Sequence, residues 1–276
     1  MIVEPAPAKI NLALHVRLRR ADGYHAIETL FAFLRDGDVL RVAPADADSF
    51  ALTGPFAAAL AGEGGNLVLA ARDRFAATIA PLPPLAVTLD KRLPIASGIG
   101  GGSADAAAML RVAARLSGLS IDDPRLVTAA TALGADVAAC LNGRSAIGTG
   151  VGEQLEAIDG LAGLPVLLVN PGVAVSTAAV FKGWDGIDRG PLPGGDAMAI
   201  ALAGRNDLAA AARSIAPAID AVLAELAAAP GARLARMSGS GATCFALFDE
   251  DVDRAAAAES IRARHPDWWL LESTLA

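Results

Sequence analysis

The sequence predicts an α+β protein. Runs with strand periodicity and runs with helical character occur in both halves of the 276-residue chain, without the regular alternation of a parallel βαβ sheet. A glycine-rich stretch at 94–104 separates one such strand from one such helix. The longest strongly apolar run, residues 164–169, is far too short to cross a bilayer. These three observations predict a globular fold that carries a ligand-binding loop.

Charge and cysteine content narrow the classes of function. The chain has 23 basic and 30 acidic residues, a net charge of −7, which disfavours general nucleic-acid binding. Its first residues lack the basic and apolar regions of a secretory signal. Cys140 and Cys244 are isolated in the sequence, which disfavours a disulfide framework and a zinc site. We therefore expect a cytoplasmic protein that acts on small molecules, with neither nucleic-acid nor membrane partners.

The first predicted element is an extended strand over residues 2–18. Ile10 and the alternate positions that follow it as far as Val16 are apolar and share one face, whereas Lys9 and Asn11 share the other. Periodicity alone favours a solvated sheet edge as the interpretation of these two polar residues.

A turn with the sequence RADGYH follows this strand, and Asp-Gly is a strong turn signal. The turn places Tyr24, the only tyrosine of the chain, beside His25. Further strands are expected at 27–34 and 39–42, joined by a second turn over 35–38.

The glycine-rich stretch 94–104 has the sequence PIASGIGGGSA. It follows a strand-like run at 85–91 and leads into a helix-forming run that ends at Ser117-Gly118. Glycines permit positive φ and let a ligand approach the backbone, so successive N–H groups can form an anion nest in front of the helix dipole. Neither the Walker A pattern nor the dinucleotide pattern fits its spacing. The stretch predicts a polyphosphate-binding loop of another kind.

Asp136 lies in a short helical segment among alanine, valine and cysteine residues. Aspartate is favoured at a helix N-cap, and it also serves as a general base. Composition does not separate these two roles, and one residue can hold both.

The remaining elements mix helices and strands. The predicted helices cover 66–79, 124–133, a segment that begins near 176 and carries Phe181, 197–229 and 252–264. The predicted strands cover 165–170, 233–237, 243–248 and 268–271, with a second glycine turn at 238–241.

The loop at 94–104 resembles the ATP loop of the GHMP kinases, which has the form P-x-x-x-G-[LI]-G-x-x-S-A before a helix. One departure is Ala96, where many members carry a further glycine. Together with five other motifs in the same order, the loop resembles the branch of the family that phosphorylates a cytidine-diphosphate sugar alcohol. These motifs are PAKINL at 7–12, RADGYH at 20–25, GADV at 134–137, NPG at 170–172 and MSGSGA at 237–242.

The resemblance implies a fold and a reaction. It implies a ribosomal-S5-like, ATP-binding N-terminal domain over 1–155 and a smaller α+β C-terminal domain over 156–276, with the active site in the cleft between them. The implied reaction transfers the γ-phosphoryl group of ATP, bound with Mg²⁺, to the 2-hydroxyl of the sugar alcohol in the non-mevalonate route to isoprenoids. A monomer or weak homodimer is expected.

The resemblance also implies roles for particular residues. It assigns Asp136 as the base, Lys9 as the cation beside it and Asn11 as a ligand of the acceptor alcohol. Ser103 is a candidate contact for phosphate or Mg²⁺. Tyr24, His25 and Phe181 match positions that line the cytidine pocket. The residues that match the ATP site are Pro94, Ile95, Ala96, Ser97, Gly98, Ile99, Gly100, Gly101, Gly102, Ser103 and Ala104.

Three other classes of function share some of these features. A homoserine or mevalonate kinase shares the glycine loop but does not need a Tyr-His pair beside a cytosine. A non-catalytic nucleotide-binding module keeps the loop but does not need Lys9 and Asp136. An NAD-dependent oxidoreductase requires an acidic residue at a strand end roughly 20 positions after the loop. Asp122 and Asp123 precede Pro124 at a predicted helix start instead, which excludes that class.

Overall fold

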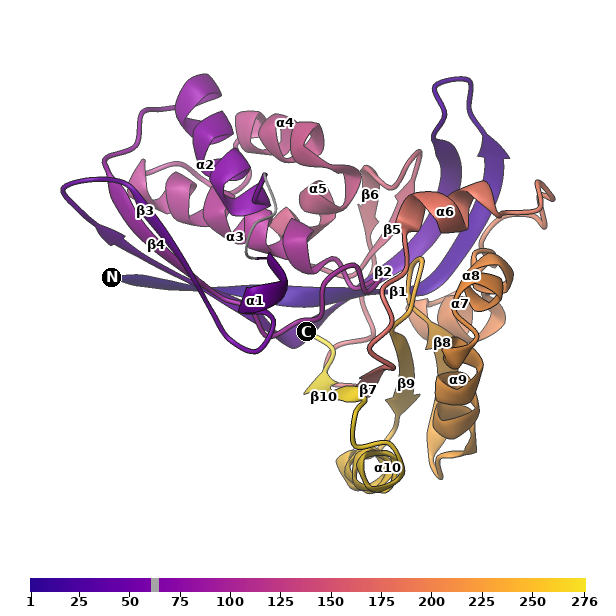
Figure 1. Cartoon of the computed structure of the whole chain (residues 1–276). Helices are drawn as coiled ribbons and strands as arrows, with labels where there is room; N and C mark the ends of the chain where they lie inside the picture. The colour runs from indigo at the N-terminus through magenta and orange to yellow at the C-terminus, as the bar shows by residue number, and fades with distance from the viewer. Residues whose placement is uncertain (61–64) are drawn as a thin grey trace. The chain divides into compact units, whose positions relative to one another are not determined.

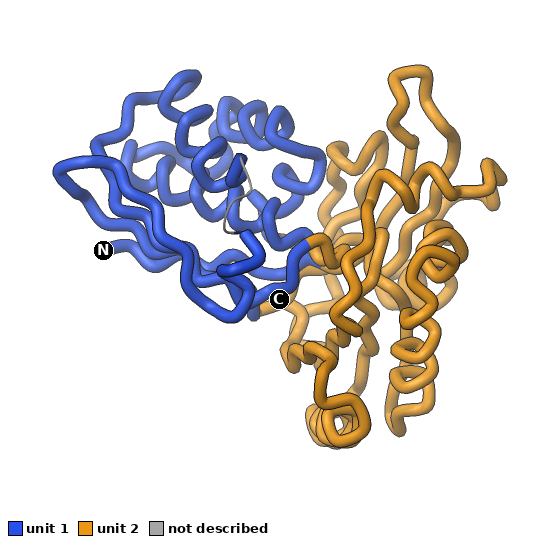
Figure 2. The backbone as a smooth tube through the Cα atoms, viewed as in Figure 1, with its two compact units in different colours: residues 1–9, 36–95, 100–143 blue, residues 10–35, 96–99, 144–276 orange. Residues whose placement is uncertain are grey.

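A computed structural model describes residues 1–60 and 65–276 of the chain. The described residues form two compact units, each assembled from three separate segments (Figure 2). These units are defined by contacts between residues and alternate along the chain, so they do not test the domain boundary predicted at residue 155, which stays a prediction. Unit 1 contains residues 1–9, 36–95 and 100–143, and unit 2 contains residues 10–35, 96–99 and 144–276.

In unit 1, a small sheet is covered by helices. β2 pairs antiparallel with β4, β3 runs parallel to β4, and β1 pairs with β2. Helices α2 to α5 pack against one another on one side of these strands (Figure 1). The elements concerned are β1 (Ile2–Arg19), β2 (His25–Pro44), β3 (Ser49–Thr53), α1 (Ala57–Leu60), α2 (Leu67–Thr78), β4 (Leu85–Asp90), α3 (Gly101–Leu116), α4 (Pro124–Leu133) and α5 (Ala135–Asn142). β1 continues into unit 2 after Lys9, and β2 enters unit 1 at Asp36.

In unit 2, a four-stranded antiparallel sheet has the strand order β10-β7-β9-β8. Helices α8, α9 and α10 contribute Ala212, Val222 and Ile261 to its apolar core. The first half of β2 pairs there with β5, and β5 pairs with β6. The elements are β5 (Ala146–Thr149), β6 (Gln154–Ala157), β7 (Pro165–Asn170), α6 (Thr177–Lys182), α7 (Ala197–Ala203), α8 (Ala209–Ile215), α9 (Ala218–Ala228), β8 (Ala232–Met237), β9 (Cys244–Phe248), α10 (Asp251–Arg264) and β10 (Trp269–Thr274).

The α+β class and most predicted elements are confirmed. Every side chain of β7 is buried, as its apolar sequence predicts. The Asp123 carboxylate caps α4 by accepting the N–H of Arg125, and Pro124 is the first helical residue. Ser176 caps α6 in the same manner. Within residues 1–60 and 65–276, no helix has the length and apolar character needed to span a membrane.

The turn predicted at 35–38 is wrong, because β2 runs without a break from His25 to Pro44. Gly37 has a packing role instead: a Cβ there would overlap the β1 backbone, reaching within 2.7 Å of the Pro7 Cα. Asp38 is buried and pairs with Lys91. The Asp-Gly-Asp sequence therefore allows close strand packing and a buried ion pair, and local turn propensity is overridden by these long-range contacts.

Candidate active site

Lys9 and Asp136 are brought together in unit 1. β1 carries Lys9 and the first turn of α5 carries Asp136, and Lys9 Nζ lies 3.1 Å from Asp136 Oδ2. The Lys9 side chain is 5% exposed and that of Asp136 is 38% exposed, so the carboxylate is accessible while the ammonium is not. The solvated-edge interpretation of Lys9 is therefore wrong. The N-cap interpretation of Asp136 is also wrong, because Gly134 occupies that position.

Arg111 of α3 holds the elements that carry this pair. Its Nε donates to Glu4 Oε1 at 2.6 Å and its Nη2 donates to the Pro5 carbonyl at 2.7 Å, both on β1. Its Nη1 donates to the Cys140 carbonyl of α5 at 2.8 Å. One guanidinium thus joins the start of β1 to the end of α5, an arrangement that the sequence did not reveal.

Gly100 lies beside the same pair. It caps α3 with φ +67°, and a Cβ there would come within 2.6 Å of Lys9 Cγ and 3.0 Å of Lys9 Cε. The aliphatic stem of Lys9 therefore packs across the N-terminus of α3. Glycine is required at this position both for the left-handed backbone and for the space.

The N-terminus of α3 has the properties of an anion site. The first N–H groups of a helix have no intrahelical acceptor, and here no side chain of the described residues caps α3 and no acidic residue lies in its first turn. The helix dipole adds positive potential at that end. Gly101, Gly102 and Ser103 form this first turn, and Gly102 is exposed. The arrangement fits a phosphate group.

The other predicted ATP-loop residues divide by burial. Pro94, Ser97, Ile99 and Ala104 are buried and anchor the loop. Ile95 and Gly98 are half-buried. Ala96 is exposed and has φ +50°, the left-handed region that glycine adopts without penalty. The alanine at this position therefore carries backbone strain that a glycine would avoid.

The loop tip at 96–99 lies in unit 2 and contacts the second glycine turn. Ser238 Oγ donates to the Gly98 carbonyl at 2.9 Å, and the Thr243 N–H donates to the Ser97 carbonyl at 3.2 Å. A Cβ at Gly98, where φ is +76°, would come within 2.9 Å of the Gly241 backbone. The MSGSGA motif thus supports one side of the glycine loop.

Asn11 is buried in unit 2 and is held by two hydroxyl groups. Its Nδ2 donates to Thr29 Oγ1 at 2.7 Å, and that hydroxyl donates to the Ala13 carbonyl at 2.7 Å. The Asn11 N–H donates to Ser238 Oγ at 3.1 Å. Because residues i and i+2 of a strand point to the same face, Asn11 projects on the face of β1 that bears Lys9. The solvated-edge interpretation is wrong for Asn11 as well.

His25 and Phe181 also meet in unit 2, together with Trp184. The His25 ring lies 5.0 Å from Phe181 and 5.7 Å from Trp184, measured between centroids. Arg19 Nε donates to His25 Nε2 at 3.3 Å, which leaves the ring proton of a neutral imidazole on Nδ1. Burial, reinforced by the Arg19 charge, lowers the pKa of His25 below 6.5. Tyr24 is 65% exposed on the preceding turn and does not join this cluster.

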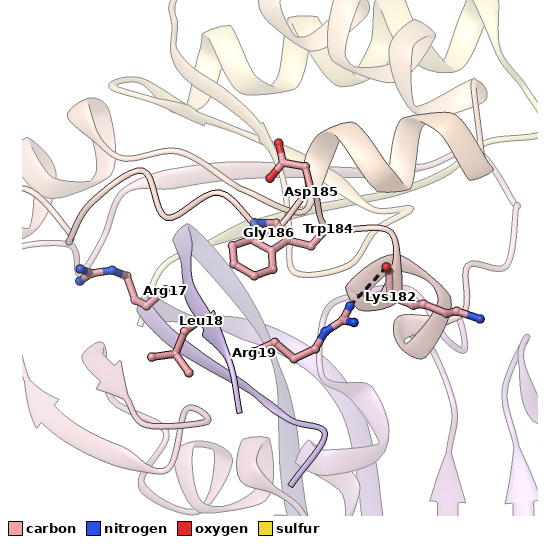
Figure 3. A pocket seen from close by; sticks show the side chains of 7 residues that line it. All are labelled: Arg17, Leu18, Arg19, Lys182, Trp184, Asp185 and Gly186. Carbon is pink, nitrogen blue, oxygen red and sulfur yellow. Dashed lines mark hydrogen bonds between the residues drawn. The ribbon is translucent and has the colours of Figure 1, made fainter. Parts of the chain in front are cut away.

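An open pocket adjoins the aromatic cluster (Figure 3). Arg19 Nη2 donates to the Lys182 carbonyl at 3.4 Å across it, and Trp184 forms part of its wall. Sequence patterns did not single out Arg19 or Trp184, because their shared place in the pocket wall depends on contacts between β1 and the segment around the end of α6. The pocket is lined by Arg17, Leu18, Arg19, Lys182, Trp184, Asp185 and Gly186.

Cys140 and Cys244 are both buried. Burial raises the pKa of the Cys140 thiol far above neutrality and that of Cys244 to about 12, so both stay protonated. No group of three or more His, Cys, Asp or Glu side chains in residues 1–60 and 65–276 is arranged to hold a metal ion. A divalent ion that enters bound to a nucleotide would need fewer protein ligands.

Two family models match the chain: the GHMP kinases N terminal domain over residues 66–144 and the GHMP kinases C terminal domain over residues 194–267. A 4-diphosphocytidyl-2-C-methyl-D-erythritol kinase from Rhizorhabdus wittichii is 57% identical over 99% of this chain and 94% of its own length. The enzyme of the same name from Sphingopyxis alaskensis is 53% identical over 97% of this chain and 96% of its own length.

Solved structures agree with these matches. A crystal structure of 4-(cytidine 5'-diphospho)-2C-methyl-D-erythritol kinase superposes with a TM-score of 0.80 at 33% identity, over 100% of this chain and 99% of that chain. Homoserine kinase from Cytophaga hutchinsonii superposes with a TM-score of 0.71 at 18% identity, over 99% of this chain and 94% of that chain, and shows only that the fold is shared. The chain belongs to the 4-diphosphocytidyl-2-C-methyl-D-erythritol kinase family of the GHMP kinases.

Proposed function

We propose that this kinase transfers the γ-phosphoryl group of ATP to the 2-hydroxyl of 4-diphosphocytidyl-2-C-methyl-D-erythritol. The observation that carries the proposal is the Lys9–Asp136 ion pair at the glycine-capped N-terminus of α3. A base, a cation and an anion site in contact are the parts that phosphoryl transfer to an alcohol needs. The names of the relatives supply the identity of the acceptor.

Asp136 is the proposed base. Its carboxylate is partly exposed, so it can accept the proton of the acceptor hydroxyl as the oxygen attacks the γ-phosphorus. The buried Lys9 ammonium lies 3.1 Å from this carboxylate and adds positive charge where the equatorial phosphoryl oxygens become more negative. Asn11, held by Thr29 and Ser238, is proposed to bind the acceptor alcohol.

ATP is proposed to bind with its phosphates at the first turn of α3. Gly102 is exposed, and among the described residues a Cβ there would approach Leu67 Cδ1 at 3.4 Å, an ordinary contact distance, so packing does not require glycine at this position. Mg²⁺ bound with the nucleotide would neutralise the phosphate charge, and Ser103, half-buried in the same turn, is its proposed protein contact.

The aromatic cluster is the proposed cytidine platform. Phe181 offers a ring face, and Tyr24 on its exposed turn can close over a base as a second face. With Nε2 occupied by Arg19, His25 presents Nδ1–H as a donor. Cytosine carries ring-nitrogen and carbonyl acceptors on one edge, so a neutral histidine donor matches it.

A comparison of acceptors tests the proposal. ATP consumption is measured with the purified protein and 4-diphosphocytidyl-2-C-methyl-D-erythritol, and in parallel with homoserine and mevalonate. The expected result is turnover with the first acceptor alone, with the phosphate found on its 2-hydroxyl by phosphorus NMR. Turnover with homoserine or mevalonate instead would place the chain with another GHMP activity.

A further inference from the structure

Three charged side chains are buried together in unit 1, and none belongs to the site described above. Lys91 Nζ lies 2.6 Å from Asp38 Oδ2 and 2.6 Å from Asp105 Oδ2. The side chains of Lys91, Asp38 and Asp105 are 3%, 0% and 4% exposed. We call this group the Lys91 cluster. Removing three charges from water is costly, so a cluster of this kind requires a compensating role.

The Lys91 cluster joins the two ends of the glycine-rich stretch. Lys91 directly follows β4 and precedes the stretch, whereas Asp105 follows it in α3. Asp38 Oδ1 accepts the N–H of Arg92 at 2.5 Å and that of Leu93 at 2.8 Å. The entry to the loop is therefore held by Asp38, and the entry and the exit are linked to each other by Lys91.

The cluster also contacts the backbone of the proposed phosphate site. A Cβ at Gly101 would lie 3.1 Å from Lys91 Nζ and 3.5 Å from Asp38 Oδ2. The buried ammonium thus packs directly against the first helical residue of α3. A displacement of Lys91 or Asp105 would move the N–H groups of the first turn, and phosphate binding depends on their placement to a fraction of an ångström.

We propose that the Lys91 cluster is the positioning element of the ATP loop, which fixes the start of α3 so that its first N–H groups face the phosphates. This inference rests on the proposed function, because it takes residues 94–104 as the ATP site. The cluster contributes no atom to the reaction. It acts through Gly101 and the loop entry, so Lys91, Asp38 and Asp105 are positioning residues.

Asp105 provides a sharp test, because only one of its oxygens is used. Asp105 Oδ1 is buried without a hydrogen-bond partner among the described residues. Burial raises the pKa of Asp105 to about 7, against the opposing effect of the Lys91 charge. Asp105→Asn keeps one acceptor for Lys91 and removes the surplus charge. Asp105→Leu removes the acceptor but leaves Lys91 and Asp38 as a balanced pair, so it is expected to fold.

The experiment measures kcat, KM for ATP and KM for the diphosphocytidyl acceptor, together with Tm, in the full chain. Lys91→Met and Asp105→Leu are each expected to raise KM for ATP by about tenfold, the effect of about 1.4 kcal/mol, with kcat and acceptor KM within about threefold of wild type. The conservative variant Asp105→Asn should keep the wild-type KM for ATP. Arg92→Met is the matched control, because this neighbouring cation is 53% exposed and pairs with Asp90 outside the cluster.

The outcomes separate this inference from the proposed function. Gly101→Val, which places a branched side chain in the loop itself, is measured beside the other variants. If it raises KM for ATP while Asp105→Leu does not, the ATP site stands and the inference is overturned. If KM for ATP is unchanged in Gly101→Val, the assignment of the ATP site fails first. A fall in Tm of Asp105→Leu without a change in KM for ATP reduces the cluster to a stabilising role and also overturns the inference.

Discussion

The proposed phosphoryl-transfer region and the proposed cytidine region are built differently. In unit 1, Lys9, Asp136 and the start of α3 are fixed by ion pairs, by Arg111 and by a glycine that permits contact. In unit 2, His25, Phe181 and Trp184 meet through ring contacts, and Arg19 Nε donates a 3.3 Å hydrogen bond to His25, beside an exposed tyrosine. Groups that take part in phosphoryl transfer must be held in fixed positions, whereas a platform that stacks on a flat base tolerates looser packing. Changes in the first region should therefore affect turnover, and changes in the second should affect acceptor affinity.

The largest effect is expected from Asp136→Asn. The substitution keeps size and most hydrogen bonding but removes the proton acceptor, so kcat should fall by about 10²–10⁴-fold with KM for ATP nearly unchanged. Asp123→Ala is the matched control. It removes a true helix cap, so it should cost about 1 kcal/mol of stability in urea unfolding and leave kcat unchanged. An Asp136→Asn enzyme with wild-type turnover would contradict the assignment of the base.

Alanine substitutions at two glycines that are close in sequence should differ in their effect on stability, although both should weaken ATP binding. Gly100→Ala forces a side chain into a left-handed residue and against the Lys9 stem, so kcat and the affinity for ATP should both fall by about tenfold or more, with a lower Tm. Gly102→Ala places its methyl group in ordinary contact with Leu67 Cδ1, at 3.4 Å, on a helical backbone, so Tm should hold or rise. Its KM for ATP should still increase, because the methyl group occupies the phosphate approach. An unchanged KM for ATP in Gly102→Ala would show that phosphate does not approach this residue.

In the cytidine region, Tyr24→Ala and His25→Ala should each raise KM for the diphosphocytidyl acceptor by about tenfold or more. Loss of one aromatic face costs about 0.5–1.5 kcal/mol beyond its area, and an unmade buried hydrogen bond costs about 1–3 kcal/mol. Steady-state kinetics with each substrate varied in turn provides the measurement. If both variants raised KM for ATP and left KM for the acceptor unchanged, the assignment of the cytidine pocket would be wrong.

A fall in pH should lower the stability of the protein and weaken acceptor binding through His25. The pKa of His25 is lowered below 6.5, so the unfolded chain takes up this proton first and stability declines as pH falls below about 6.5. Once pH reaches the lowered pKa, the imidazolium faces the Arg19 guanidinium, and KM for the acceptor should rise. His25→Gln should lose this dependence while KM for ATP follows the wild-type profile. If the KM for the acceptor still rose at low pH in His25→Gln, a group other than His25 would be responsible for the pH dependence.

The smallest effect is expected from Ala96→Gly. Holding an alanine in the left-handed region costs the folded state about 1–2 kcal/mol. Glycine removes this cost, but its greater freedom in the unfolded chain offsets about 0.5–1 kcal/mol of the gain. The variant should therefore be more stable by up to about 1.5 kcal/mol in urea unfolding. A loss of stability would mean that the strain is relieved in solution by another backbone conformation.

Local sequence signals predicted most of the elements, whereas the pairing of Lys9 with Asp136 was implied only by the family resemblance. Asp123 and Pro124 mark a helix start by themselves, and β7 is apolar throughout, so both were predictable. The burial of Lys9 and the continuity of β2 through Gly37 depend on strands that pass close by, which periodicity does not encode.

The supporting residues of the candidate site were missed for the same reason. Lys91 and Asp38 look like ordinary surface charges in the sequence and become a buried cluster only when β2, β4 and α3 meet. Arg111 lies in an alanine-rich helix without a distinguishing motif. Such residues act through partners far away in the chain, and a single sequence contains no local signal for them.

The alternation of the two units along the chain has a consequence during synthesis. Residues 10–35 belong to unit 2, yet the bulk of that unit begins only at Arg144, about 110 residues later. Ribosomes add about 5–20 residues per second, so these two strand segments wait about 10–40 s for a partner such as Asp207, which lies 191 residues after Val16 and accepts its N–H. During that interval β1 and β2 can pair with each other, but the parts of both strands that contact the rest of unit 2 still lack those partners.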